Sequence, residues 1–317
     1  MHTEFDISSQ PIKTLVLAPK RLMRSSLALT LDILETANKV SGQSVFDVDV
    51  ASTDQFKRAG AGHSIIILPG LGITSSNELD DLLCDPETLV LLRYLKHLGA
   101  QGQEILFATS CSGVFLFAEA GLVDKKRVTT SWWLAPLLKT RYPQVQISSR
   151  ELTVDAGNIL TAGAALAQSD LILNLVERFA GLQAAHDCRK LLLIDDRRSQ
   201  IPYIDTSMLI ASDPALRLAE TYILQRMAEE ITVPQIAAAA KLGQRTFARR
   251  LSRIASLTPV QFLQSLRVGK AVQLAVQTHL SSAEIAEKVG YSDGSALRRV
   301  VTKQTGKSLD THRQLAN

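Results

Sequence analysis

The chain has 317 residues, of which 46% are hydrophobic and 21% charged, and its formal net charge is +4 at pH 7. This length favours two domains, and the hydrophobic content is ample for packed cores. No run approaches the ~18 apolar residues of a membrane span, and the first residues lack the basic start of a secretory signal. The three cysteines, Cys84, Cys111 and Cys188, lack metal-ligand spacing. We therefore expect a cytoplasmic protein with no membrane association, metal or cofactor.

The first half of the chain alternates strand-like and helix-like patterns. Apolar runs predict strands at residues 14–18, 46–51, 64–68 and 105–108, and weaker ones at 144–147 and 158–161. Helical spacing occupies residues 27–40, 78–98 and about 165–179. The third and fourth runs are almost continuously apolar, as in strands buried on both faces of a parallel sheet. The alternation predicts an open α/β sheet with helices on both faces.

Cys111 lies on a predicted strand-to-helix elbow, between the strand at 105–108 and a helical run that begins at Val114. A side chain at such an elbow projects above the sheet beside a helix N-terminus, which favours an anion and lowers a thiol pKa. The turn Pro69-Gly-Leu-Gly72 also ends a buried strand and is expected to face the same crevice. Three roles for Cys111 are open: a ligand contact, an inert buried thiol, and a redox-sensing thiol.

The boundary between two domains is expected between Leu191 and Asp213, where the sequence is polar, contains a proline and shows no sustained period. This gives domains at residues 1–190 and 213–317, joined by a linker at 191–212. From Asp213 onward the pattern is helical, and 15 lysines and arginines face 8 aspartates and glutamates. A basic domain on a mildly acidic body is typical of a protein that binds nucleic-acid phosphates.

The C-terminal domain contains a duplicated helix-turn-helix pattern. The first copy runs from Ile236 to Leu251 and the second from Ile285 to Val300, with paired arginines at the same place in each second helix. Gly290 suits the left-handed residue that ends a helix, whereas Lys241 fits that place less well. Ser292 and Asp293 are expected to cap the second recognition helix. Phe247, Leu251, Leu297 and Val300 are expected on the inner faces.

Polar and cationic residues on the two second helices are the predicted DNA contacts, because arginine can bind guanine edges or phosphates. In the first copy these are Gln244, Arg245, Thr246, Arg249, Arg250 and Arg253; in the second they are Ser295, Arg298, Arg299 and Lys303.

The segment from Pro214 onward resembles the DNA-binding domain of AraC/XylS-type regulators, which carries two helix-turn-helix motifs joined by a long helix. Ala255-Ser-Leu-Thr-Pro259 is similar to the stretch after the family's first motif, and Ile285-Ala-Glu-Lys-Val-Gly-Tyr-Ser-Asp293 is similar to the signature of its second. Gly269 in the connecting helix and Leu309 and His312 after the second motif depart from the family pattern.

The first half resembles the class I glutamine-amidotransferase-like (PfpI-type) fold, and the whole chain resembles GlxA-like regulators, which join that fold to an AraC-type domain. The stretch Thr109–Val123 carries the resemblance, and Leu34–Asn38, Thr129–Trp132 and Asp155–Gly163 extend it. The resemblance implies a flavodoxin-like open sheet followed by an all-α DNA-binding domain.

Enzymes of this fold need a cysteine nucleophile, a histidine base and a nearby glutamate. The resemblance places Cys111 at the nucleophile, but Ser131 at the histidine position and Asp32 at the glutamate position. A serine cannot act as a general base at neutral pH, so a degenerate, ligand-binding site is expected. Its candidate residues are Asp32, Gly70, Leu71, Cys111, Ser112, Ser131 and Trp132.

The sequence therefore predicts a transcriptional regulator rather than an enzyme. Its expected partners are double-stranded promoter or operator DNA, a small effector (a nitrogenous metabolite by family resemblance), a second copy of the chain, and RNA polymerase. The alternative is a cysteine-dependent hydrolase or glyoxalase-like enzyme with an accessory DNA-binding tail.

Overall fold

The computed structural model describes residues 10–56, 62–101, 104–197 and 199–314. The chain divides into two compact units, Met1–Gln200 and Ile201–Asn317, and the division falls within the segment expected to be a linker. Within the described residues, no helix is long and apolar enough to cross a membrane.

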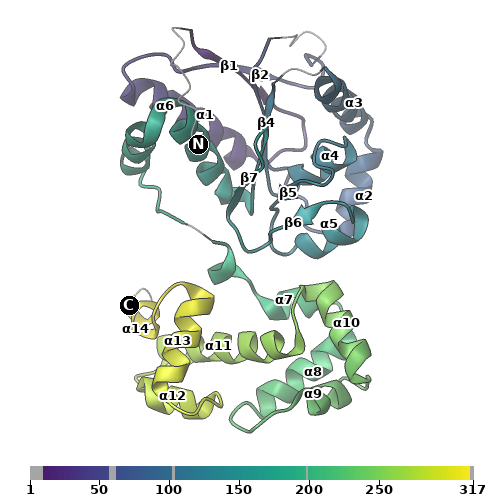
Figure 1. Ribbon diagram of the computed structural model, residues 1–317, viewed down its shortest axis with the longest axis vertical. Coiled ribbons are helices and arrows are strands. Elements are labelled where there is room, and N and C mark those ends of the chain that lie inside the picture. Colours follow the sequence, from purple (N-terminus) through teal and green to yellow (C-terminus); the bar gives the residue numbers. More distant parts are fainter. Residues whose placement is uncertain (1–9, 57–61, 102–103, 198, 315–317) are drawn as a thin grey trace. The chain divides into compact units, whose positions relative to one another are not determined.

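The first unit is built on a six-stranded sheet (Figure 1). Its strands are β1 (Ile12–Leu17), β2 (Phe46–Ala51), β3 (Ile65–Leu68), β4 (Leu106–Ser110), β7 (Thr153–Asp155) and β8 (Ile159–Ala162), in the order β2-β1-β3-β4-β8-β7. All neighbours are parallel except β7, which runs antiparallel to β8 at the edge. Without the edge strand β7, the order β2-β1-β3-β4-β8 is the flavodoxin-like order, which confirms the predicted fold class.

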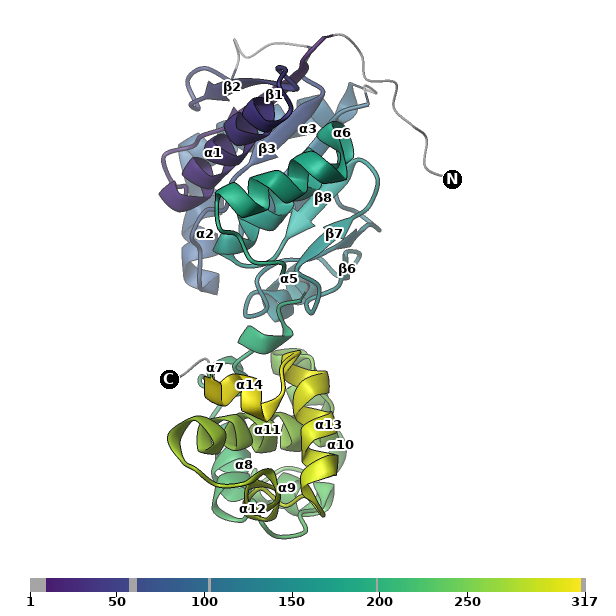
Figure 2. The ribbon, with the colours of Figure 1, turned by 90° about the vertical axis from the view of Figure 1, so that its left-hand side faces the viewer.

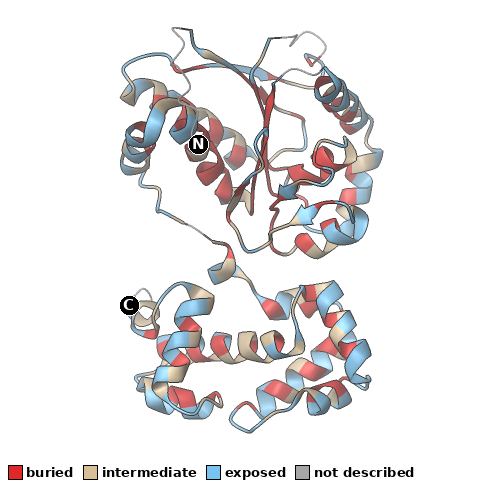
Figure 3. Ribbon diagram, viewed as in Figure 1, coloured by how far each residue is buried: buried red, intermediate tan, exposed pale blue. Residues whose placement is uncertain are grey.

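Helices cover both faces of this sheet because the central strands are apolar on both sides. On one face, α1 (Arg24–Val40) and α6 (Gln168–Leu191) lie side by side, as Figure 2 shows. On the other lie α2 (Ser76–Cys84), α3 (Pro86–Ala100), α4 (Gly113–Glu119) and α5 (Ala135–Arg141). Alternate residues of β3 enter the two cores, Ile66 on one side and Ile67 on the other, so the centre of the sheet is buried on both faces (Figure 3). A small parallel pair, β5 (Arg127–Val128) and β6 (Gln146–Ile147), completes the unit.

Two predicted helices have different bounds in the structure. The helix expected at 78–98 is two helices, α2 and α3, because Pro86 starts α3 and Asp85 caps it by accepting a hydrogen bond from the backbone N–H of Thr88. The helix expected at 165–179 begins with a 3₁₀ turn, η1 (Ala165–Ala167), and continues as α6 to Leu191. The backbone of Gly181 is not helical, with a φ of 89°, so it interrupts the helix two residues after the predicted end, and a second helical segment follows to Leu191.

The second unit is all helical, as predicted. It contains η2 (Ile201–Tyr203), α7 (Thr206–Ile210), α8 (Pro214–Gln225), α9 (Val233–Ala239), α10 (Gln244–Ala255), α11 (Pro259–Gln277), α12 (Ser282–Lys288), α13 (Gly294–Thr305) and α14 (Leu309–Gln314). Ile210 is fully buried in the core of this unit. The C-terminal part of the expected linker is therefore folded onto the helical unit.

Candidate nucleic-acid interface and N-terminal site

Each helix-turn-helix is a short helix followed by a longer second helix, α9 with α10 and α12 with α13, and α11 joins the two motifs. Capping boxes start three of these helices: Thr232 with Gln235 for α9, Thr258 with Gln261 for α11, and Ser281 with Glu284 for α12. Ile236 and Ile285, at equivalent places in the two copies, are both fully buried. The repeat in the sequence therefore corresponds to a repeat in packing.

The tight turn in each motif needs a left-handed residue. Gly290 has a φ of 75° and Lys241 has a φ of 56°. An L-residue with a side chain is strained in this region, whereas glycine adopts it freely. The expected poor fit of Lys241 is thus a local strain in the first motif.

Lys241→Gly is expected to raise the free energy of unfolding by about 0.5–1 kcal/mol, because relief of the left-handed strain exceeds the extra unfolded-state entropy of glycine. The measurement is urea unfolding of the full chain followed by far-UV circular dichroism. Lys241→Ala removes the same charge but keeps a Cβ, so it is the matched control. Equal stability of the two variants would contradict the assignment of strain to the backbone.

The inner faces of the second helices are apolar, as expected, with one shift of position. Phe247, Leu251 and Leu297 are fully buried. Val300 is only partly buried, and the fully buried residue of that turn is Val301. Adjacent helix positions lie about 100° apart, so the sequence pattern leaves one-residue ambiguities of this kind.

Most of the predicted DNA-contact side chains are exposed on the second helices. On α10 these are Gln244, Arg245, Thr246, Arg249 and Arg253, and on α13 they are Ser295, Arg298, Arg299 and Lys303. The Arg298 guanidinium donates a hydrogen bond to Ser295 Oγ at 3.0 Å, which holds the two side chains on one surface. A basic, exposed face opposite a buried apolar face is the arrangement that phosphate and base contacts require.

Arg250 differs from the other candidates because it has a partner within the protein. Its Nε donates to Asp213 Oδ2 at 2.5 Å, and the Arg250 side chain is only 36% exposed. Asp213 also caps α8 by accepting from the backbone N–H groups of Ala215 and Leu216. The paired arginines of the two copies are therefore not equivalent, since Arg250 joins α10 to α8 whereas Arg299 is exposed.

The cap of α13 also differs in detail from the prediction. Asp293 alone accepts from the backbone N–H groups of Ser295 and Ala296, at 2.7 and 2.8 Å. Ser292 Oγ donates to the Asp293 carboxylate instead of capping the helix. These hydrogen bonds, first the one from Ala296, hold the pKa of Asp293 below its usual value.

In the first unit, Cys111 occupies the strained elbow that the sequence predicted. It follows β4 with a φ of 55°, and its N–H donates to the carbonyls of Ala162 and Gly163 at 3.0 and 2.7 Å. Its side chain is 2% exposed, and Ser131 Oγ donates a hydrogen bond to Cys111 Sγ at 3.0 Å. The residue beside the thiol is therefore a hydroxyl donor and not a base.

Among the other predicted site residues, Gly70 and Ser131 lie beside Cys111, and all but one of the set are buried. Gly70, Leu71, Ser112, Ser131 and Trp132 are all buried, and Ser112 Oγ accepts from the backbone N–H of Ile73 at 3.2 Å. Asp32 is exposed on α1.

Ser26 joins this cluster, although the sequence reading did not single it out. A Cβ at Gly70 would lie 3.2 Å from Cys111 Cβ and 3.5 Å from the Ser26 hydroxyl, so these residues meet at one point. Ser26 is fully buried in the first turn of α1, and Asp32 lies nearly two turns further along. Ser26 could have been predicted from the sequence, because it lies at the N-terminus of the helix after β1, on the side that faces the sheet.

Ser131 occupies the position of the expected histidine, and two histidines of the described residues have other partners. His63 lies 3.0 Å from the Asp49 carboxylate, and His97 contacts Gln101 at 2.8 Å. Among the described residues, no group of three histidine, cysteine, aspartate or glutamate side chains could hold a metal ion.

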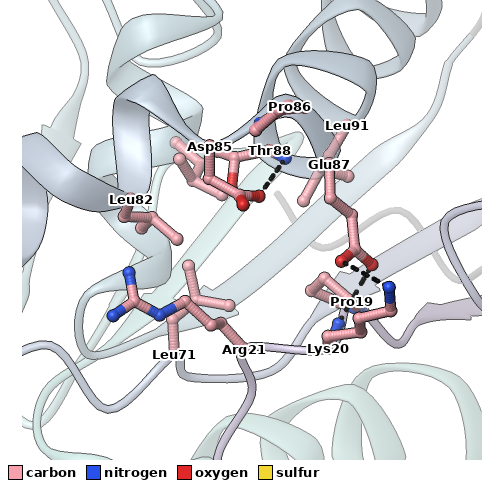
Figure 4. A pocket seen from close by; sticks show the side chains of 11 residues that line it. Pro19, Lys20, Arg21, Leu71, Leu82, Asp85, Pro86, Glu87, Thr88 and Leu91 are labelled. Carbon is pink, nitrogen blue, oxygen red and sulfur yellow. Dashed lines mark hydrogen bonds and ion pairs between the residues drawn. The ribbon is translucent and has the colours of Figure 1, made fainter.

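A pocket of about 440 Å³ opens beside the residues around Cys111 and is lined by one of them, Leu71 (Figure 4). Its lining comes from the loop after β1, the turn after β3, and α2, α3 and α4: Pro19, Lys20, Arg21, Leu71, Leu82, Asp85, Pro86, Glu87, Thr88, Leu91 and Leu116. The carboxyl ends of β1 and β3 flank the point where the strand order reverses, which is where open α/β sheets bind ligands.

The two carboxylates of the pocket accept hydrogen bonds, whereas the Arg21 guanidinium forms none with the described residues. Glu87 accepts hydrogen bonds from the Lys20 backbone N–H and the Thr53 hydroxyl, and Asp85 accepts from Thr88. Arg21 extends toward Leu82 in Figure 4 and, within the described residues, forms no hydrogen bond or ion pair. Its guanidinium interacts electrostatically with Glu78 and, like the Lys20 ammonium 3.9 Å from Glu87, has donors to offer to a ligand.

Comparisons with known proteins agree with this architecture. Residues 236–314 match the family described as "Helix-turn-helix domain". The HTH-type transcriptional regulator GbdR of Pseudomonas aeruginosa is 23% identical over 276 residues, which cover 84% of this chain and 74% of GbdR. The HTH-type transcriptional regulator GlxA of Rhizobium meliloti is 25% identical over 68% of this chain and 67% of GlxA.

An isonitrile hydratase of Pseudomonas putida is 31% identical over 105 residues, covering 33% of this chain and 42% of the hydratase. Among solved structures, an AraC family transcriptional regulator from Pseudomonas putida is similar with a TM-score of 0.47 and 19% identity, covering 58% of this chain and all of that one. The duplicated helix-turn-helix in a basic unit, together with similarity to the transcriptional regulators GbdR and GlxA over most of the length, identifies the chain as a DNA-binding transcriptional regulator.

Proposed function

We propose that this regulator binds promoter DNA through α10 and α13 under the control of a small molecule held by its first unit, and that it is not an enzyme. The observation that carries the non-enzymatic part of this proposal is the environment of Cys111, whereas the DNA-binding part rests on the exposed basic faces of α10 and α13. The thiol is almost completely buried and accepts a hydrogen bond from Ser131, where cysteine catalysis needs a base that removes a proton.

The enzyme alternative is favoured by the partial likeness to an isonitrile hydratase. It is tested by incubating the full chain with isonitriles, amides, peptides and glyoxals and measuring product. We expect no turnover above that of Cys111→Ala. Turnover that depends on Cys111 would overturn the non-enzymatic part of the proposal.

A redox role for Cys111 is tested separately. Equal DNA affinity in peroxide and in thiol reductant would exclude a redox role for Cys111.

The pocket beside Leu71 is the proposed effector site. Four leucines supply an apolar wall, and Arg21 supplies a cation that forms no hydrogen bond or ion pair with the described residues, so the proposed effector carries an anionic group on an apolar body. The surroundings of Cys111 are packed, whereas this pocket has room for a small metabolite.

Arg21→Ala is expected to reduce the affinity for an organic anion by about 10- to 100-fold, because it removes a charge-assisted hydrogen bond worth about 1.5–3 kcal/mol. The measurement is a thermal-shift titration of the full chain with a panel of branched and linear carboxylates. Arg24→Ala, at the exposed first residue of α1, is the matched control. Equal shifts in both variants would contradict this placement of the effector.

Homodimer formation and contact with RNA polymerase complete the proposal. Sedimentation equilibrium of the full chain tests the first, and pull-down of RNA polymerase by the DNA-bound chain tests the second.

Selection of genomic DNA fragments by the purified full chain at two salt concentrations tests sequence-specific DNA recognition. We expect a few enriched sites, each with two half-motifs about one helical turn apart, because each chain carries two recognition helices. Weak binding to all fragments that disappears with salt would show phosphate attraction without sequence reading.

A further inference from the structure

Gln200, the last residue of the first unit, is inserted into the site around Cys111. Gln200 is buried, with only 2% of its surface exposed. Its Oε1 accepts a hydrogen bond from the backbone N–H of Trp132 at 3.3 Å. Its Nε2 lies within hydrogen-bond distance of four oxygens: Thr130 O at 2.9 Å, Glu151 O at 3.1 Å, Ser149 O at 3.2 Å and Thr129 Oγ1 at 3.2 Å. A carboxamide suits these partners because its NH₂ group carries two donors and its carbonyl oxygen is an acceptor.

The backbone around Gln200 is shaped to receive this side chain. A Cβ at Gly163 would lie 2.3–2.6 Å from the Gln200 carboxamide, so any other residue there would displace it. The Gln200 N–H donates to Arg150 O at 3.0 Å, and Ser199 pairs with Glu151 in an antiparallel bridge. The segment before the second unit is therefore held by both its backbone and its side chain.

The same hydrogen bonds lead from Gln200 to Cys111. Gln200 binds the carbonyl of Thr130, whose hydroxyl donates to the carbonyl of Cys111 at 2.7 Å. The next residue, Ser131, binds the Cys111 thiol. In the other direction, Gln200 is joined by one peptide bond to Ile201, where η2 and the second unit begin.

We propose that Gln200 is a positioning residue that couples the Cys111 site to the start of the DNA-binding unit. This inference rests on the proposed control of DNA binding by the first unit. A movement of residues 129–132 changes the hydrogen bonds offered to the Gln200 carboxamide. A buried carboxamide without hydrogen-bond partners costs far more free energy than one that is paired. Gln200 is therefore either buried with all its hydrogen bonds or withdrawn from the site into solvent.

Linkage makes this coupling measurable without knowing the effector, because DNA binding must then change the state of the Cys111 site in return. The readout is the alkylation rate of Cys111 by iodoacetamide in the full chain, followed by peptide mass spectrometry to separate it from exposed Cys84. The rate is measured with and without a duplex chosen by the genomic selection. We expect DNA to change it by about 5-fold or more in the wild type.

Gln200→Ala and Gln200→Glu are both expected to remove this dependence on DNA. Glutamate keeps the size of the side chain but presents an acceptor to the oxygens that now receive the Nε2 donors, so it separates hydrogen bonding from filling space. Asn38→Ala is the matched control, because the Asn38 carboxamide also donates to a backbone carbonyl and accepts from backbone N–H groups, but at residues 45–46 instead of 129–132. It is expected to lower stability and retain the DNA dependence.

The proposal is overturned if DNA leaves the alkylation rate of wild-type Cys111 unchanged, if both Gln200 variants keep the dependence, or if Asn38→Ala loses it as well. Failure of the wild type to bind any selected duplex specifically would be a different result, since it would reject sequence-specific DNA binding itself.

Discussion

Arg249→Ala is expected to weaken binding to the selected operator by about 5- to 150-fold, the effect of losing a base contact worth about 1–3 kcal/mol. Arg249 is exposed on α10, one turn after Arg245 and one turn before Arg253. The measurement is fluorescence anisotropy of a labelled operator duplex at several salt concentrations. If Arg249 binds phosphate instead of a base, the loss is similar for all sequences and the salt slope falls by about one.

Arg250→Ala is the matched control because it removes the same side chain from the next position of the same helix. Arg250 holds Asp213, the cap of α8, so its loss leaves that buried carboxylate without its ion-pair partner. We expect lower stability of the helical unit and a smaller loss of operator affinity in the folded protein. Equal losses of affinity in the two variants, with equal stability, would contradict the division of roles between these neighbours.

Gly290→Ala is expected to destabilise the helical unit by about 3 kcal/mol or more. Gly290 has a φ of 75°, and a Cβ there would lie 2.4 Å from Met227 O and 2.5 Å from Arg267 Nη2. Arg267 cannot yield easily, because it donates to the carbonyls of Met227 and Glu229 at 3.2 and 2.9 Å. The substitution therefore combines backbone strain with the loss of a packed contact between loops.

Gly306→Ala provides the control for the backbone term alone. Gly306 ends α13 at a φ of 73°, but a Cβ there meets nothing within 4 Å, so a cost of about 1 kcal/mol is expected. Both tryptophans, Trp132 and Trp133, lie in the first unit. Urea unfolding followed by circular dichroism should shift in Gly290→Ala, whereas the tryptophan fluorescence transition should not. A similar cost in both variants would refute the steric argument.

The amino-acid sequence by itself determined the features that depend on local periodicity. Continuous apolar runs identified β3 and β4, and repeated spacing identified both helix-turn-helix motifs with buried Ile236 and Ile285. The elbow at Cys111 was also readable, because a strand, a cysteine and a helix follow one another directly. Such signals survive because each depends on neighbours within a few residues.

Only the tertiary structure decided which polar groups meet. Nothing in the local sequence pairs Arg250 with Asp213, or places Ser26 beside Gly70. Gln200 stands in a polar segment that reads as a linker, yet its partners lie 49 to 71 residues earlier in the chain. The physical reason is that a carboxamide or guanidinium has no periodicity of its own, and its partner is chosen by where folding brings an unsatisfied donor or acceptor.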